Sequence, residues 1–297
     1  MKHKLSITLL LLGMFLVTQF LGLLVVSIYS SNSLPVQMDS SESNIFSLIF
    51  AFLIAFALIF FLMKYKLAIV IRMWFFLVVI LALWISLNAF LTLTTLANIS
   101  IIALVIATIL ATLKVFMPHF ITHNLTELLI YPGIAAVFVP ILTPINSIFL
   151  LILISLYDMW AVWRVGIMQK MAKYQMEEVK VFGGFLVPSV SDKVRKEITN
   201  IKQKYKGKKI PAKFMKKKFR VNLAILGGGD VIFPIVVAGV FMRAFGLVPA
   251  LFITFGSLAG LIFLMIITKK GKAYPAMPYI STGAFIGIIL AKLILGF

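Results

Sequence analysis

Three acidic side chains stand inside long apolar stretches of this 297-residue sequence, where a carboxylate is costly to place. They are Glu127, Asp158 and Asp230, and the other six of the nine Asp and Glu residues lie in polar segments. A charged group in hydrocarbon costs roughly 3 kcal/mol even on permissive scales, so such residues face a protein interior or a water-filled cavity. Each of the three is therefore a candidate functional residue.

Asp158 and Asp230 could act as a pair. Asp158 lies about six residues before the end of one apolar run and Asp230 about ten after the start of the next, which puts both about 9–15 Å deep. Two carboxyl groups in contact share one proton and work together as base and acid. Such a pair activates water against a peptide carbonyl with no covalent intermediate, metal or cofactor. Alternatively, the two acids act separately, each paired with a cation or serving proton or cation passage.

The residues around both aspartates favour the interpretation that the two acids act as a pair. Asp158 follows Tyr157, and Asp230 ends the run Gly227-Gly228-Gly229-Asp230. Glycines beside a carboxylate allow close helix approach and loosen the helix, which leaves room for water and an extended substrate. The run is not a dinucleotide-binding fingerprint, because no further glycine has the required spacing and no strand is predicted before it.

A Tyr-Asp in one span and a Gly-x-Gly-Asp in the next resemble the presenilin and signal peptide peptidase family of intramembrane aspartyl proteases (the GxGD type). The resemblance implies that Asp158 and Asp230 are catalytic and that Tyr157, Gly227 and Gly229 belong to the active-site motif. It also implies an aspartic endopeptidase that cuts the transmembrane helices of other membrane proteins.

The third signature of that family is Pro-Ala-Leu at the start of the last span, where it lines the active site. A literal match, 249–251, opens the eighth predicted span and is in the wrong place. Position favours Pro275, Ala276 and Met277, which follow a basic loop and open the ninth. Met in place of Leu keeps the size and apolarity of the side chain. We therefore expect these three residues to bind substrate.

The resemblance further implies that single-span membrane proteins or peptides enter from the lipid and are drawn out as a strand beside the seventh and ninth spans. The compact length is most similar to archaeal members, which implies an integral multi-pass protein of a prokaryotic cell membrane. The need for accessory subunits and the oligomeric state stay open. A cation channel or transporter using the same acids is the alternative, although the two halves show no internal repeat of the kind many transporters have.

The elements that position these residues are predicted to be membrane-spanning helices. The sequence is 62% hydrophobic with a mean hydropathy of +1.10, and its apolar runs reach the length of about 20 residues that crosses a bilayer. We predict an all-α, polytopic protein with one integral membrane domain: six spans in 1–167, a basic loop over 168–220 and three spans in 221–297. The nine predicted spans are 5–29, 45–63, 67–91, 96–117, 124–142, 145–164, 221–243, 246–268 and 277–296.

Basic residues predict the orientation of these spans. Every second connection carries Lys or Arg, including Lys114 at the end of the fourth span, which places the N-terminus in the cytoplasm and the C-terminus outside. Of 28 Lys and Arg, 17 lie between Arg164 and Arg220. Because this charge is local, we expect the loop to contact anionic lipid headgroups and do not expect nucleic acid binding.

Two further predictions concern the cytoplasmic side. Glu127 lies near the cytoplasmic end of its span, so we expect it to reach the interface and to have a structural role. The segment 179–188 (VKVFGGFLVP) is typical of an extended, amphipathic strand with a glycine break. It is either an ordinary interfacial loop or, by the family resemblance, a segment that gates or pairs with substrate.

Overall fold

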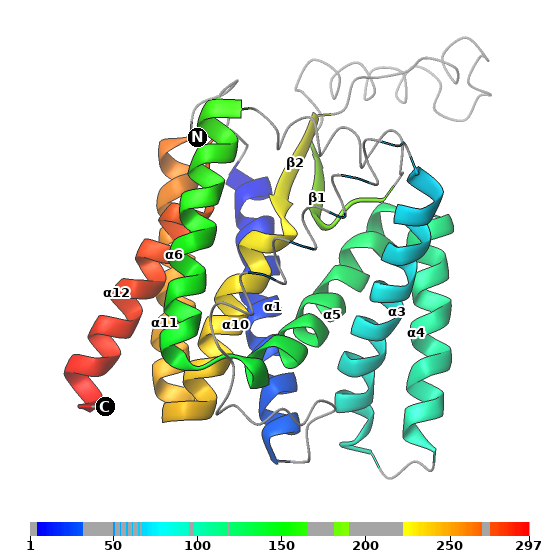
Figure 1. The fold of residues 1–297 in the computed structure, drawn as a ribbon, viewed down its shortest axis with the longest axis horizontal. Coiled ribbons are helices and arrows are strands. Elements are labelled where there is room, and N and C mark those ends of the chain that lie inside the picture. Colours follow the sequence, from blue (N-terminus) through cyan, green and yellow to red (C-terminus); the bar gives the residue numbers. More distant parts are fainter. Residues whose placement is uncertain are drawn as a thin grey trace, which may run out of the picture.

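The computed structural model describes residues 5–31, 67–94, 98–117, 119–165, 181–189, 222–268 and 274–296, with residues 50, 54, 58, 61 and 65. In this part of the chain, eight helices are long and apolar enough to cross a membrane (Figure 1). They are α1 (Leu5–Ser31), α3 (Ala68–Leu91), α4 (Ile99–Phe116), α5 (Phe120–Phe138), α6 (Pro144–Trp160), α10 (Gly228–Phe245), α11 (Leu247–Ile267) and α12 (Met277–Leu295). A 3-10 turn, η1 (Val139–Ile141), follows α5, and a π-helical turn, η2 (Ala161–Val165), follows α6.

These helices correspond to eight of the nine predicted spans. The second predicted span, 45–63, lies almost entirely outside the described residues, so the count of nine and the orientation of the termini stay predictions. Proline and glycine mark the joins as expected: Pro144 begins α6, and the hydroxyl of Thr143 caps that helix by accepting from the Asn146 amide. Gly246, with φ of 91°, makes the tight turn between α10 and α11.

A two-stranded antiparallel sheet departs from the all-α prediction. Its strands are β1 (Gly184–Ser189) and β2 (Asn222–Gly227), with Gly184 opposite Gly227 and Leu186 opposite Ile225. The extended conformation predicted for 179–188 is thus confirmed where it overlaps β1. The start of the seventh span is corrected, because 222–227 form a strand and the helix begins at Gly228. A strand therefore does precede the glycine run. A short apolar run fits a strand or a helix equally well, and the partner strand decides.

The helices pack closely around the two segments that carry the aspartates. In Figure 1, α10 continues directly from β2 and runs down through the bundle, with α6 beside it. Close packing depends on glycine at several points: a Cβ on Gly22 of α1 would overlap Ile235 of α10. Helices α11 and α12 approach so closely that a Cβ on Gly256 or Gly283 would overlap the backbone of the other helix. Small residues at such contacts are how membrane helices gain packing energy.

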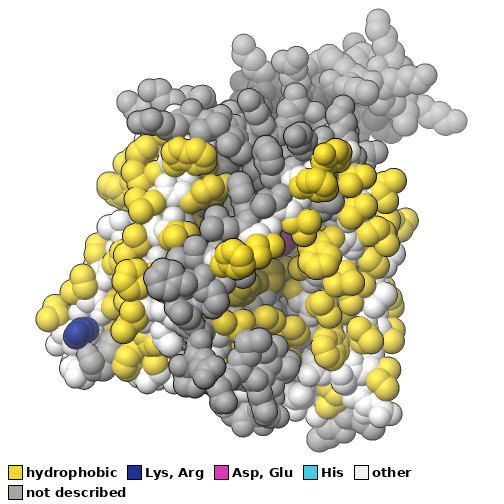
Figure 2. Space-filling model, in the orientation of Figure 1, with side chains coloured by type: hydrophobic (Ala, Val, Ile, Leu, Met, Phe, Trp, Pro, Cys, Tyr) yellow, Lys and Arg dark blue, Asp and Glu magenta, His cyan; other side chains and the backbone are white. Residues whose placement is uncertain are grey.

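The outside of this bundle is apolar. Figure 2 shows hydrophobic side chains over most of the coloured surface on one face, and Leu153, Phe263 and Leu293 are among the exposed large side chains. Hydrocarbon cannot hydrogen-bond the backbone, so helices with apolar exteriors are the structures that cross it. The chain is therefore built as an integral, multi-pass membrane protein.

Candidate active site

Asp158 lies in the last turn of α6 and is buried, with 4% of its surface exposed. Its Oδ2 accepts a hydrogen bond of 3.0 Å from the backbone N–H of Met277, and the backbone of Ala276 hydrogen-bonds the same carboxyl group. Met277 is the first residue of α12, and the N-terminus of a helix stabilises negative charge. The other oxygen, Oδ1, has no hydrogen-bond partner among the described residues. That oxygen is buried, so its capacity to accept a hydrogen bond is unused among these residues.

Asp230 lies in the first turn of α10 and is half-buried. The backbone of Gly227, the residue at the N-cap, hydrogen-bonds its carboxyl group. An acidic third residue that reaches back to the N-cap amide is one half of a capping box. The sequence placed Asp230 about ten residues into its helix, whereas the structure places it at the third position because β2 replaces the first helical turns.

The two aspartates lie at the same end of the bundle, which we call the ribbon end because β1 and β2 lie there. Asp158 is in the last turn of α6, and Asp230 is in the first turn of α10, directly after β2. Their carboxyl groups are near enough to interact electrostatically. The structure thus places the two acids that the sequence singled out at the same end of the bundle.

The three glycines before Asp230 differ in their surroundings. A Cβ on Gly227 would lie 3.1 Å from Oδ2 of Asp230, so a larger residue would push against the carboxylate. A Cβ on Gly228 would lie 3.2 Å from Oη of Tyr131. Gly229 is exposed, and its nearest neighbour would be the Phe233 ring at an ordinary 3.4 Å. The first two glycines therefore make room for neighbours, whereas the third leaves backbone open beside the site.

The residues predicted to bind substrate lie at the start of α12, with Pro275 and Met277 buried and Ala276 half-buried. The Met277 amide touches Asp158, which supports the choice of this segment over the literal match at 249–251, which lies in the first turn of α11. Tyr157 is 38% exposed, and its ring centroid lies 6.3 Å from that of Trp160.

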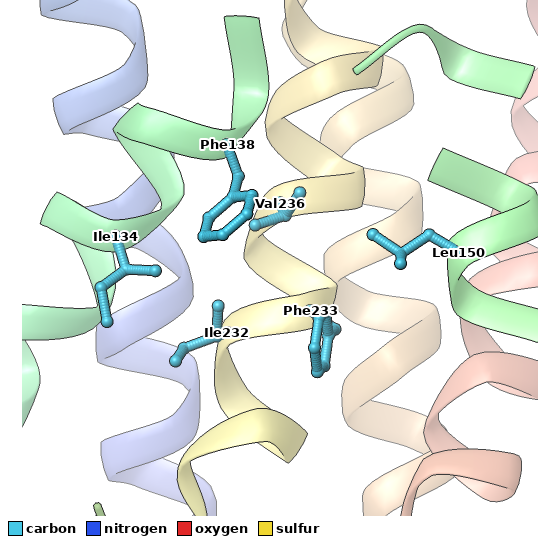
Figure 3. A pocket seen from close by; sticks show the side chains of 6 residues that line it. All are labelled: Ile134, Phe138, Leu150, Ile232, Phe233 and Val236. Atoms are coloured by element: carbon cyan, nitrogen blue, oxygen red, sulfur yellow. The ribbon is translucent and has the colours of Figure 1, made fainter. Parts of the chain in front are cut away.

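An apolar cavity of about 210 Å3 lies along the two turns of α10 that follow Asp230. Figure 3 shows side chains from α5, α6 and α10 around it. The lining residues are Ile134, Phe138, Leu150, Ile232, Phe233 and Val236. Its composition suits an apolar side chain.

Sequence reasoning missed two buried polar residues beside this site. Nε2 of Gln19, on α1, donates a 3.0 Å hydrogen bond to the carbonyl of Val231, the residue after Asp230. Tyr131, on α5, packs edge-to-face against Phe185 of β1 with centroids 5.4 Å apart. A glutamine in the middle of an apolar span was a signal for the first, whereas a tyrosine in a membrane helix carries none.

Glu127 is buried inside the protein, so the expectation that its side chain reaches the interface is wrong, whereas its buried ion pair fits the structural role that was predicted. It is 1% exposed, and Nζ of Lys114 lies 2.6 Å from its Oε1. The two helices that carry these residues are antiparallel neighbours joined by a short connection, so the lysine that ends α4 meets the acid near the start of α5. Lys114 is correspondingly 3% exposed and is no free charge of a loop.

Comparison with known proteins agrees with the geometry. The family model described as signal-peptide peptidase, presenilin aspartyl protease matches residues 12–297. Two solved structures of a presenilin family intramembrane aspartate protease, in space groups C222 and P2, share the fold with TM-scores of 0.63 and 0.61. Both are 19% identical to this chain; the first match covers 97% of this chain and 99% of the other, and the second covers 96% of each. No curated protein matched. The chain belongs to the signal-peptide peptidase and presenilin family of aspartyl proteases and is an intramembrane peptidase.

Proposed function

We propose that Asp158 and Asp230 are the catalytic dyad with which this peptidase hydrolyses peptide bonds inside the transmembrane helices of other membrane proteins. The proposal rests on the surroundings of the Asp158 carboxyl group: Oδ2 accepts from the Met277 amide, Oδ1 has no hydrogen-bond partner among the described residues, and Asp230 is close enough to interact with it electrostatically. Membership in a family of aspartyl proteases favours this function over that of a cation channel or transporter.

The proposed reaction is acid–base hydrolysis through water. Because the start of α12 stabilises negative charge on Asp158, we assign it as the base that takes a proton from water. The water oxygen bonds to the peptide carbon while protonated Asp230 donates its proton to the carbonyl oxygen. The resulting gem-diol then loses its C–N bond: one hydroxyl proton returns to Asp230, and the proton held by Asp158 passes to the leaving nitrogen. Both groups return to their starting states.

A substrate helix must first be unwound, because its carbonyls are occupied by their own hydrogen bonds. The ribbon offers a place for the extended segment. Ile225 of β2 is 42% exposed, and among the described residues no group bonds the outward-facing backbone at this position. A substrate strand added to this edge would run toward the exposed Gly229 and the dyad. We propose single-span membrane proteins as substrates; the basic stretch 202–220, expected on anionic headgroups, lies outside the described residues.

The proposal is tested with purified protein, a single-span substrate, and the variants Asp158→Asn and Asp230→Asn. We expect wild type to cut inside the span, and each variant to lose about a thousandfold or more in rate while it unfolds at a similar temperature. Mass spectrometry of the products locates the cut. Cleavage that survives in either folded variant would show that the dyad is assigned wrongly.

A further inference from the structure

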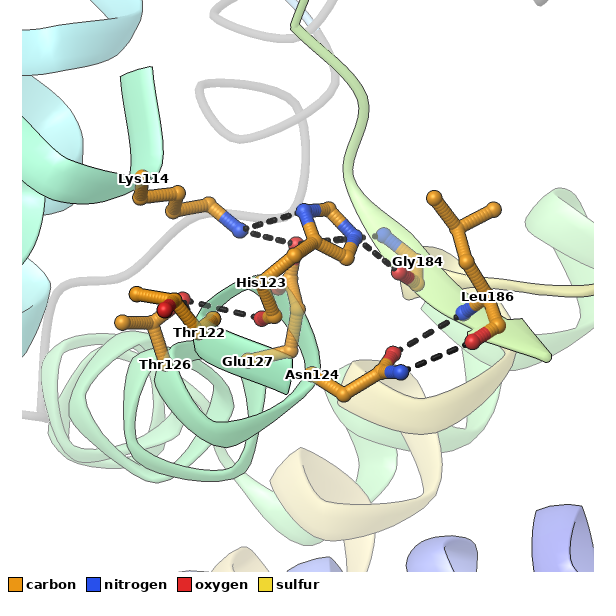
Figure 4. Close-up of polar contacts among 8 residues, drawn as sticks. All are labelled: Lys114, Thr122, His123, Asn124, Thr126, Glu127, Gly184 and Leu186. Carbon is orange, nitrogen blue, oxygen red and sulfur yellow. Dashed lines mark hydrogen bonds and ion pairs between the residues drawn. The ribbon is translucent and has the colours of Figure 1, made fainter. Parts of the chain in front are cut away.

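The outer edge of β1, the edge turned away from β2, is occupied by side chains of α5 (Figure 4). At Gly184, the carbonyl accepts from Nε2 of His123 at 2.8 Å and the N–H donates to Oε1 of Glu127 at 3.3 Å. At Leu186, the side-chain amide of Asn124 accepts from the N–H at 3.0 Å and donates to the carbonyl at 2.7 Å. Asn124 thus bonds Leu186 as a neighbouring strand would.

The next residue on that edge is Pro188, which has no N–H to offer. Every outward N–H of β1 up to this point is therefore used or absent, and a further strand could not pair there. Because the other edge of β1 pairs with β2, the ribbon keeps one open edge among the described residues, that of β2.

A buried ion pair holds these α5 side chains in place. Nζ of Lys114 lies 2.6 Å from Oε1 of Glu127 and 3.3 Å from Nδ1 of His123. An ammonium group only donates, so Nδ1 accepts and the ring proton is on Nε2, where it bonds Gly184. The Lys114 and Glu127 side chains are 1% and 2% exposed, so neither has solvent as an alternative partner.

The held strand is connected to Asp230 through the backbone. Gly184 lies opposite Gly227, and the N–H of Gly228 donates to the carbonyl of Gly183 at 3.3 Å. Gly227 in turn bonds the carboxyl group of Asp230. A shift of β1 would therefore move the N-cap of α10 and, with it, the carboxyl group.

We infer that Lys114, His123, Asn124 and Glu127 form an edge clamp, a set of positioning residues that fixes β1 and leaves β2 as the edge open to substrate. The clamp thereby sets which peptide bond of an added strand meets Asp230. Paired strands can shift in register. A ribbon that is loosely held, or that has a second open edge, would therefore accept a substrate strand in several registers. The inference rests on the proposed proteolytic function.

The test compares variants that remove the contacts to β1 with one that removes only the charge. Asn124→Leu deletes both bonds to Leu186. Lys114→Met/Glu127→Leu deletes the acceptor for the Gly184 amide, whereas Lys114→Met/Glu127→Gln removes the ion pair but keeps an acceptor oxygen. We expect Asn124→Leu and the Leu double variant to lower kcat about tenfold with little change in KM, and to cut at additional neighbouring bonds. The Gln double variant, which loses the hold of Lys114 but keeps an acceptor for the Gly184 amide, should fall between wild type and the Leu double variant in both kcat and the number of bonds cut.

Tyr29→Phe is the matched control, since it removes another buried bond from a side chain to a carbonyl, 2.7 Å to Ile85, far from the ribbon. It should leave the products unchanged. Hydrogen exchange of the Leu186 amide, read by mass spectrometry, should quicken in Asn124→Leu whether or not any substrate is cut. Wild-type products and kcat in both contact-deleting variants, or unchanged exchange, would overturn the clamp. If the wild-type protein itself did not cut the substrate within its span, that result would instead count against the proposed function.

Discussion

At the scale of single residues, Asp158 has two roles: it is the proposed base, and its Oδ2 also caps the first turn of α12 through the Met277 amide. The first turn of a helix has backbone N–H groups without partners inside the helix. In α12 there is one fewer of them, because Pro278 at the second position has no N–H. The group proposed for chemistry therefore also holds α12 against α6.

This double role predicts that replacements of Asp158 differ in stability while sharing inactivity. Asp158→Asn keeps an oxygen that can accept from Met277, whereas Asp158→Ala leaves that amide without a partner. We expect the Ala variant to be less stable than the Asn variant by about 1 kcal/mol, the usual value of a helix cap. Thermal unfolding in detergent measures the difference, and equal unfolding temperatures would argue against the cap.

A second prediction at this scale concerns Gly227. Its φ of −62° suits any residue, so the need for glycine is one of space: a Cβ would press on the Asp230 carboxylate. We expect Gly227→Ala to lower kcat about tenfold or more by displacing that group, with little change in unfolding temperature. Gly13→Ala, at an exposed helical position with no atom within 4 Å of the added carbon, is the control. Full activity in Gly227→Ala would show that the carboxylate tolerates the shift.

At the scale of elements, α12 carries Met277 into the site and is itself placed by its contact with α11. That contact is backbone on backbone at Gly256 and Gly283. Helix α12 is also tied to α6 by a 2.7 Å hydrogen bond between the hydroxyls of Ser155 and Ser281, one turn from the Asp158–Met277 bond. The position of Met277 thus depends on the contacts of α12 with α11 and α6.

We therefore expect Gly283→Ala to impair activity from a distance. The added carbon would overlap the carbonyl oxygen of Gly256, so the helices must separate, at a cost of about 1–3 kcal/mol. Unfolding temperature and kcat should fall together. Ile286→Ala, which is 52% exposed on the same helix, should change neither much. A Gly283→Ala protein with wild-type stability would mean that the two helices can adjust.

The sequence predicted the helices well because each is an uninterrupted apolar run that needs no partner to be recognised. It missed the ribbon because the choice between strand and helix at Asn222–Gly227 depends on pairing with Gly184–Ser189, more than thirty residues earlier. The pairing of Lys114 with Glu127 was missed for a different reason. Each residue was assigned to the interface by its place near a span end, although a cation and an acid on successive antiparallel spans already suggested a pair.

At the scale of the whole molecule, the burial of Lys114 removes one charge from the pattern that predicts the orientation. The remaining basic connections still favour a cytoplasmic N-terminus. The aspartates could be identified from the sequence because a charged residue in an apolar run is rare. Their prediction as a candidate site therefore depended little on the predicted number of spans, whereas the predicted orientation depends on it.

The orientation can be measured directly, because the chain contains no cysteine. We expect a single cysteine at Lys2 to resist a membrane-impermeant maleimide in intact cells and a single cysteine at Phe297 to react. Lysed cells, in which both should react, are the control for labelling efficiency. Equal labelling of both in intact cells would imply an even number of spans, and the reverse pattern would invert the orientation.

The open edge of β2 also bears on the supply of the second reactant. Among the described residues no group bonds the outward backbone of Ile225, and an unpaired N–H or C=O is not tolerated in hydrocarbon, so we expect water at this edge whenever no substrate strand lies there. From this edge, β2 leads directly into α10 and Asp230. Docking of a substrate strand would displace that water toward the dyad, so the same strand edge that receives the peptide would also bring the water that cuts it.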